Sequence, residues 1–111
     1  MNSQKFGGER AWFPQARFGV FVHLGLYTLL GENENACRKN RTAEEYAAQL
    51  LPQFNPSRFN ADEWVRQVQD AGARYIVLTA KHSEGFCLWD TKYTSYKITN
   101  TPFKRDLVKE L

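Results

Sequence analysis

The chain has 111 residues, 42% of them hydrophobic and 24% charged, proportions that are ordinary for one small globular domain. Its net charge is only +3, and the bases are spread along the chain without a basic stripe or a nucleic-acid-binding module, so we expect no nucleic-acid partner. We also expect no membrane span, because no apolar run approaches the ~20 residues that a spanning helix needs.

The N-terminal segment is polar. Residues 1–11 are predicted to be a flexible lead-in, with Gly7-Gly8 as a mobile pair and without the apolar stretch of a secretory signal peptide. Two cysteines, Cys37 and Cys87, form neither a C-x-x-C pair nor a disulfide framework, so we expect free thiols. These features favour the cytoplasm but leave the compartment open.

Two short apolar runs predict strands. Residues 18–23 read Phe-Gly-Val-Phe-Val-His, and residues 75–80 read Tyr-Ile-Val-Leu-Thr-Ala. Both are rich in β-branched and aromatic residues and lack alternation with polar residues. Such runs are typical of strands that are buried on both faces, as in a parallel sheet.

Three helices are predicted around these strands. The first starts at Thr42 or Ala43 and ends at Leu51, before Pro52, and another starts at Arg105 and continues to Leu111.

The clearest helix opens at Asn60, where Asn60 and Glu63 form a predicted capping box. An apolar stripe follows, and Gly72 is predicted to end the helix in the left-handed conformation. The stripe comprises Trp64, Val65, Val68 and Ala71. A helix between two apolar strands predicts a crossover connection and parallel pairing of those strands.

Both histidines of the chain follow the predicted strands. His23 ends the first strand, and Lys81-His82-Ser83 follows the second. Parallel strands end at the same edge of a sheet, about 4.8 Å apart, and ligands bind at that edge in sheets and barrels. Glu34, in the polar loop after the first strand, is the acid that could overhang this edge.

Two interpretations of this edge stay open on spacing alone. The histidines are either ordinary hydrogen-bonded rim residues or part of a site for one small ligand. A metal site is less well supported, because two histidines lack a convincing third ligand. Glu84 and Asp90 lie nearby in the sequence but without the spacing of metal ligands.

Several blocks of sequence in a fixed order resemble a known family. They are Trp12-Phe13, residues 16–27, 54–56, 59–64, 71–82, 85–86, 88–90 and 101–111. With this order and spacing the chain resembles the opening of the family 29 glycoside hydrolases, the retaining α-L-fucosidases. The resemblance covers nearly everything after the lead-in, so residues 12–111 are identified as part of a catalytic domain of that family.

The resemblance implies an α/β fold, the N-terminal part of a (β/α)₈ TIM barrel with about two of its eight βα units. It implies that His23 and His82 bind fucose hydroxyls and that Glu34 matches the glutamate of a sugar-contacting Glu-Trp pair. Ser83 replaces the second histidine of the Lys-His-His motif and can still hydrogen-bond the sugar. Two aromatic rings are also replaced, because Asn35 and Leu24 stand where the family has tryptophan.

The family reaction is double-displacement hydrolysis of terminal α-L-fucosides with retention, without a metal or another cofactor. The partner implied is a fucoside or a fucosylated glycan. In this family the nucleophilic Asp follows the fourth strand and the acid/base comes later, so we expect no catalytic residue in this segment and no activity from it alone.

A partial barrel has open sheet edges and uncovered apolar surface, so we also expect self-association or pairing with a complementing fragment. A second hypothesis belongs to a different class. The chain would then be a non-catalytic sugar-binding or self-assembling βαβ module.

Overall fold

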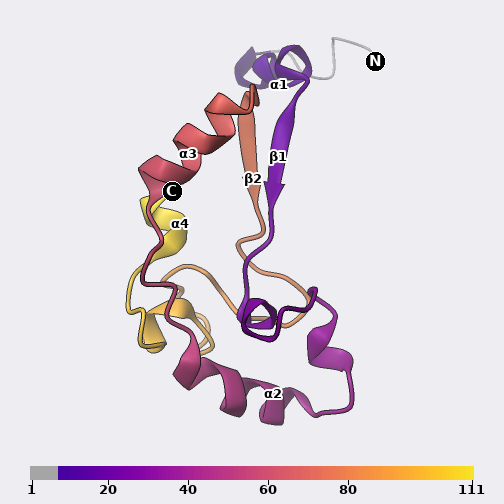
Figure 1. Ribbon diagram of the computed structural model, residues 1–111, viewed down its shortest axis with the longest axis vertical. Helices are drawn as coiled ribbons and strands as arrows, with labels where there is room; N and C mark the ends of the chain where they lie inside the picture. Colours follow the sequence, from indigo (N-terminus) through magenta and orange to yellow (C-terminus); the bar gives the residue numbers. More distant parts are fainter. Residues whose placement is uncertain (1–7) are drawn as a thin grey trace.

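The computed structural model describes residues 8–111, and a two-stranded parallel sheet lies at its centre (Figure 1). Strand β1 (Gly19–Val22) pairs with β2 (Tyr75–Leu78), with Gly19 opposite Tyr75 and Val22 opposite Leu78. Helix α3 (Ala61–Asp70) lies between the two strands in the sequence and runs beside the sheet. The predicted βαβ unit with parallel strands is therefore confirmed, with strands shorter than predicted.

Helix α3 begins and ends where the sequence predicted. The side chain of Asn60 accepts a hydrogen bond from the Glu63 amide at 3.0 Å. The capping box is only half formed, because the Glu63 carboxylate accepts from the side chain of Gln67 at 3.3 Å. Gly72 follows the helix with φ of 86°, the left-handed conformation that glycine adopts without steric penalty.

A complete capping box occurs instead at helix α2 (Ala43–Leu50). The Thr42 hydroxyl accepts from the Glu45 amide at 3.1 Å, and the Glu45 carboxylate accepts from the Thr42 amide at 2.8 Å. Tyr46 and Leu50 on this helix are fully buried. Helix α2 is thus tied to the core, and a 3₁₀ turn containing the predicted stop, Pro52, follows it.

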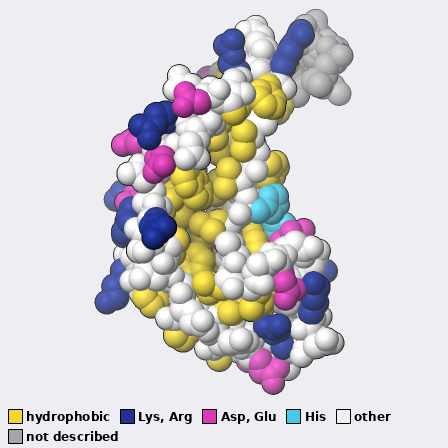
Figure 2. Space-filling model, in the orientation of Figure 1, with side chains coloured by type: hydrophobic (Ala, Val, Ile, Leu, Met, Phe, Trp, Pro, Cys, Tyr) yellow, Lys and Arg dark blue, Asp and Glu magenta, His cyan; other side chains and the backbone are white. Residues whose placement is uncertain are grey.

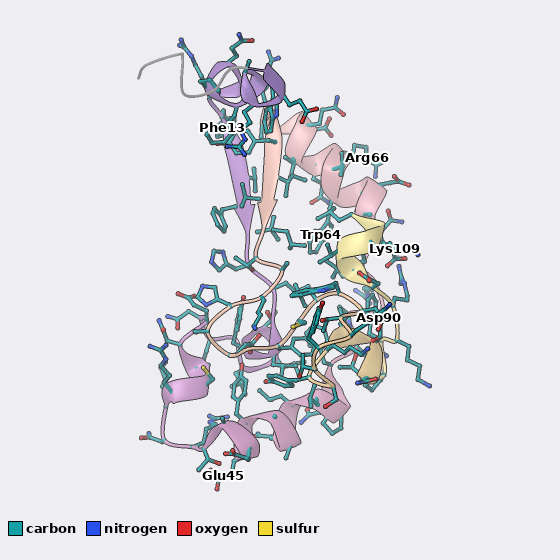
Figure 3. All side chains as sticks on the ribbon, turned by 180° about the vertical axis from the view of Figure 1, so that it is seen from behind. Phe13, Glu45, Trp64, Arg66, Asp90 and Lys109 are labelled. Atoms are coloured by element: carbon teal, nitrogen blue, oxygen red, sulfur yellow. The ribbon has the colours of Figure 1, made fainter. Side chains whose placement is uncertain are left out.

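The two ends of the described chain also contain short helices. Helix α1 (Trp12–Ala16), which the sequence analysis missed, places Trp12 and Phe13 against Tyr75, with ring centroids 5.9 and 5.3 Å from the tyrosine ring. Figure 3 shows Phe13 at the N-terminal end of the strands. Helix α4 (Leu107–Glu110) is shorter than predicted and is capped by Asp106. Residues 1–7 of the predicted lead-in lie outside the described residues, and Gly8–Arg10 form one 3₁₀ turn.

The packed core lies beyond the C-terminal ends of the strands, where α2 crosses under a group of loops (Figure 1). Its largest members come from segments distant in sequence and pack around aromatic pairs such as Phe54 and Phe86, whose ring centroids are 5.2 Å apart. Twelve hydrophobic residues form the buried cluster: Leu26, Tyr27, Ala36, Tyr46, Leu50, Phe54, Phe59, Phe86, Leu88, Ile98, Phe103 and Leu107. This core supports the loops at the edge of the sheet where the histidines lie.

The prediction that both strands are buried on both faces is wrong in this structure. No residue of β1 or β2 is fully buried, and Phe21 and Val77, which are opposite each other, are 62% and 37% exposed. The physical reason is that no segment of residues 8–111 covers this face. Figure 2 shows apolar side chains open to solvent here, with the two histidines beside them. In the described part of the chain, no helix is long and apolar enough to cross a membrane.

Candidate functional site

The structure brings the two histidines together at the C-terminal edge of the sheet. His23 follows the last residue of β1, and its ring centroid lies 5.5 Å from that of His82. On its other side the His23 ring is 5.1 Å from the ring of Phe21, two residues earlier on the same face of the strand. The His23 ring is exposed and has no hydrogen-bond partner among the described residues. Both of its nitrogens are available to a ligand.

The ring of His82 is oriented by the residue that follows it. The Ser83 amide donates to His82 Nδ1 at 2.8 Å, so in the neutral ring the proton resides on Nε2. Nε2–H is then a hydrogen-bond donor on a half-buried imidazole. The pair therefore offers a fixed donor from His82 and a donor and an acceptor from His23, a combination suited to neighbouring hydroxyl groups.

The other two predicted site residues lie beside this pair. The Ser83 hydroxyl donates to the backbone carbonyl of Glu34 at 3.0 Å, across 49 positions of sequence. This bond joins the loop after β1 to the loop after β2, so the structure places Glu34, His82 and Ser83 in one cluster. The serine oxygen keeps its lone pairs free to accept another hydrogen bond. Asn35, next to Glu34, is exposed and adds no ring to the cluster.

A partly buried carboxylate next to the cluster, that of Glu84, was not among the predicted site residues. Glu84 accepts from the Leu26 amide at 3.2 Å and from the Tyr46 hydroxyl. Burial raises the pKa of Glu84, and the hydrogen bonds from Tyr46 and from backbone amides, together with the electrostatic influence of the nearby His82, only partly oppose this effect. One signal in the sequence could have indicated it, because Glu84 is a charged residue directly before the apolar run that includes Phe86.

Within residues 8–111, no three side chains of His, Cys, Asp or Glu gather in an arrangement that could hold a metal ion. Cys37 and Cys87 are both free thiols in the structure.

Comparison with known proteins decides the family. The sequence model of the family described as Alpha-L-fucosidase matches residues 2–111, nearly the whole chain. The chain belongs to the α-L-fucosidase family. It is 34% identical to human plasma alpha-L-fucosidase over 118 aligned residues, an alignment that covers 91% of this chain and 25% of that protein. The chain thus spans about a quarter of the length of that relative.

Solved structures of α-L-fucosidases agree with this assignment. The alpha-L-fucosidase GH29 from Bacteroides thetaiotaomicron superposes with a TM-score of 0.81 and 38% identity, over 90% of this chain and 25% of that one. The alpha-L-fucosidase AlfC from Lactobacillus casei, solved in complex with alpha-L-fucose product, superposes with a TM-score of 0.79 and 34% identity, over 91% of this chain and 34% of that one. The two parallel strands therefore correspond to the N-terminal quarter of a TIM barrel, as the fold prediction stated.

Proposed function

We propose that this α-L-fucosidase family chain supplies part of the fucose-binding site of a retaining glycosidase, with His23, Glu34, His82 and Ser83 as the sugar-contacting residues. The observation that supports this most is the pairing of the His23 and His82 rings, 5.5 Å apart at the edge of the sheet. A second support is the hydrogen bond that brings Glu34 beside Ser83. The AlfC relative binds fucose, and its structure superposes over most of this chain.

The chemistry of the cluster fits a sugar with adjacent hydroxyl groups. Each hydroxyl can donate one hydrogen bond and accept two, so it needs both kinds of partner. His82 Nε2–H donates to one hydroxyl, His23 either donates or accepts, and the Glu34 carboxylate accepts. The exposed ring of Phe21 beside His23 adds an apolar surface for the carbon face of the sugar.

The chain alone is expected to bind without hydrolysing. Retaining glycosidases use two carboxyl groups about 5–5.5 Å apart, one as nucleophile and one as acid/base. Glu84, a partly buried carboxylate two residues after His82, already accepts hydrogen bonds from Leu26 and Tyr46 and is not free to attack a sugar. Glu34 would then be the only described carboxylate of the cluster able to face a ligand, and one carboxyl group is insufficient.

The test is calorimetric titration of the 111-residue chain with L-fucose, together with an assay of a chromogenic α-L-fucoside. We expect L-fucose to bind, its mirror image D-fucose to bind more weakly, and the fucoside to remain uncleaved. His23→Ala and His82→Ala should each weaken binding by about three- to tenfold, the range of one lost hydrogen bond. Lys81→Ala is the matched control, since Lys81 is exposed next to His82 and hydrogen-bonds no described residue through its side chain.

Three results would contradict the proposal. Absence of L-fucose binding by the folded chain would exclude the sugar site. Equal affinity for both mirror images, or unchanged affinity in both histidine variants, would place binding elsewhere. Turnover of the fucoside by the pure chain would show that the two required carboxyl groups are present after all.

A further inference from the structure

The partly buried carboxylate of Glu84 joins three segments that meet at the histidine edge. Its own backbone lies in the loop after β2, two residues from His82. One oxygen, Oε1, accepts from the Leu26 amide in the loop after β1 at 3.2 Å, and the other, Oε2, accepts from the Tyr46 hydroxyl on α2. These partners lie 58 and 38 positions away in the sequence. A single side chain thus connects both histidine loops to the core helix.

The loop after β1 is shaped to receive this carboxylate. Gly25 is fully buried, and a Cβ added to it would overlap both Glu84 Oε1 and the ring of Tyr27. Only glycine leaves room for the carboxylate to approach the backbone this closely. Gly25 is two residues after His23, so the contact fixes the chain directly after that histidine.

Burial of a carboxylate is unfavourable unless hydrogen bonds compensate for the lost hydration. Glu84 accepts one hydrogen bond from a hydroxyl and one from a backbone amide, and such bonds are stronger than neutral ones when the carboxylate is ionised. An apolar residue here would avoid the desolvation of a charge, but it could not accept from either donor. The hydrogen bonds of Glu84 therefore hold the loop after β1 and the loop after β2 in position where the two loops approach each other.

We infer that Glu84 is a positioning residue of the proposed fucose-binding site. Its carboxylate links the loop after β1 to the loop after β2 and so holds His23 and His82 side by side. The role of Glu84 in sugar binding rests on the proposed function, but the placement of the two imidazole rings can be measured without any sugar. Ser83 makes another link between the same loops, through the carbonyl of Glu34. That link is exposed, whereas the hydrogen bonds of Glu84 are partly buried, so the link through Glu84 is expected to dominate.

The test uses NMR of the full 111-residue chain without ligand. The readouts are the nuclear Overhauser contacts between the two imidazole rings and the hydrogen-exchange rate of the Leu26 amide. In Glu84→Ala we expect the ring contacts to weaken at least about twofold and the Leu26 amide to exchange about tenfold faster or more, because it loses a bond to a charged acceptor. Glu84→Gln keeps an oxygen for Leu26 and a polar group for Tyr46, so it should preserve both readouts within about threefold.

Asp90→Asn is the matched control. Asp90 is also a carboxylate in the segment after β2, but it accepts from Lys97 and Thr99 and does not bond to the loop of His23. We expect this variant to leave the ring contacts unchanged. If it weakens them as much as Glu84→Ala does, the effect is general loosening and the inference is wrong.

Other outcomes separate the inference from the proposed function. Unchanged ring contacts in a folded Glu84→Ala chain would overturn the inference, whether or not fucose binds. If Glu84→Ala does not fold, Glu84→Met keeps most of the side-chain volume but cannot replace the carboxylate that accepts from Leu26 and Tyr46. Intact ring contacts with an unchanged Leu26 exchange rate in that variant would overturn the inference instead. Loss of the ring contacts in Glu84→Ala, together with no L-fucose binding by the wild-type chain, would support the positioning role and reject the sugar site.

Discussion

At the scale of single residues, Glu84 forms hydrogen bonds that join three segments, but its carboxylate loses hydration through partial burial. Burial raises the pKa of its carboxyl group, and the hydrogen bond from Tyr46, the backbone amides and His82 lower it by less. The folded chain therefore holds this proton to a higher pH than the unfolded chain, where a glutamate has a pKa of about 4.3. The contribution of Glu84 to the stability of the fold is fully present below the unfolded-state pKa. It decreases as pH rises through the folded-state pKa.

We expect Glu84→Gln to remove this pH dependence. In urea unfolding followed from pH 4 to pH 7, the free energy of unfolding of the wild type should fall relative to that of the variant as pH rises. Glu32→Gln is a control of opposite sign, because the hydrogen bond from Lys39 lowers the pKa of the exposed Glu32. The contribution of Glu32 to the free energy of unfolding is present above its unfolded-state pKa and is lost as pH falls through its folded-state pKa. Parallel curves for wild type and Glu84→Gln would contradict the prediction.

The sequence predicted that His23 and His82 of the candidate site lie together, and it missed the contacts of Glu84 for a physical reason. His23 and His82 were placed together because each follows an apolar run, and the ends of parallel strands meet. Glu84 could not be predicted in the same way, because its role depends on Leu26 and Tyr46, which no local pattern connects to it. Burial of a charged side chain is decided by tertiary contacts, which a spacing rule does not contain.

At the scale of elements, α2 and α3 have the same kind of cap but different ties to the rest of the molecule. Thr42 and Asn60 each accept a hydrogen bond from the amide three residues later. Helix α2 buries Tyr46 and Leu50 in the core, whereas α3 has no fully buried residue. In Figure 3, Trp64 lies on the inner side of α3 and Arg66 on its outer side. Loss of the cap of α2 should therefore lower the global free energy of unfolding more than loss of the cap of α3.

We expect Thr42→Ala to lower the global free energy of unfolding by about 1 kcal/mol, the usual effect of removing a cap. Asn60→Ala should lower it by less and should act mainly as faster hydrogen exchange in the first turn of α3. Urea unfolding followed by tryptophan fluorescence and by exchange measures both. An equal global loss in the two variants would show that α3 is coupled to the core as firmly as α2.

Elements were predicted best where a local signal coincides with the fold. The strands and α3 followed from apolar runs and from the Asn60 cap, and their existence is confirmed. Helix α1 was missed because it has five residues, includes Pro14 and lacks a side-chain cap. The predicted burial of both strand faces was wrong because burial depends on what packs against a strand. An apolar run indicates that a strand face packs against something, but it does not show that the packing partner belongs to this chain.

At the scale of the whole molecule, the chain is elongated. Its radius of gyration is 16.4 Å and its extents are 47 × 28 × 28 Å, whereas a compact domain of about 100 residues has a radius of gyration near 13 Å. An apolar groove of about 870 Å³ lies between α3, β2 and α4, lined by residues such as Val68, Ile76 and Leu111. The exposed side chains of Phe21 and Val77 form a second apolar surface on the sheet.

Open sheet edges beside exposed apolar faces favour association between copies of a chain. We expect the 111-residue chain to form dimers or larger species whose population increases with concentration in sedimentation experiments. Phe21→Thr combined with Val77→Thr keeps residues that favour strands and removes apolar surface, so it should weaken association by about tenfold or more. Tyr93→Thr is the control, because Tyr93 is 98% exposed and lies outside both strands. A wild-type chain that stays monomeric at all concentrations, or a Tyr93→Thr effect equal to that of the double variant, would contradict this prediction.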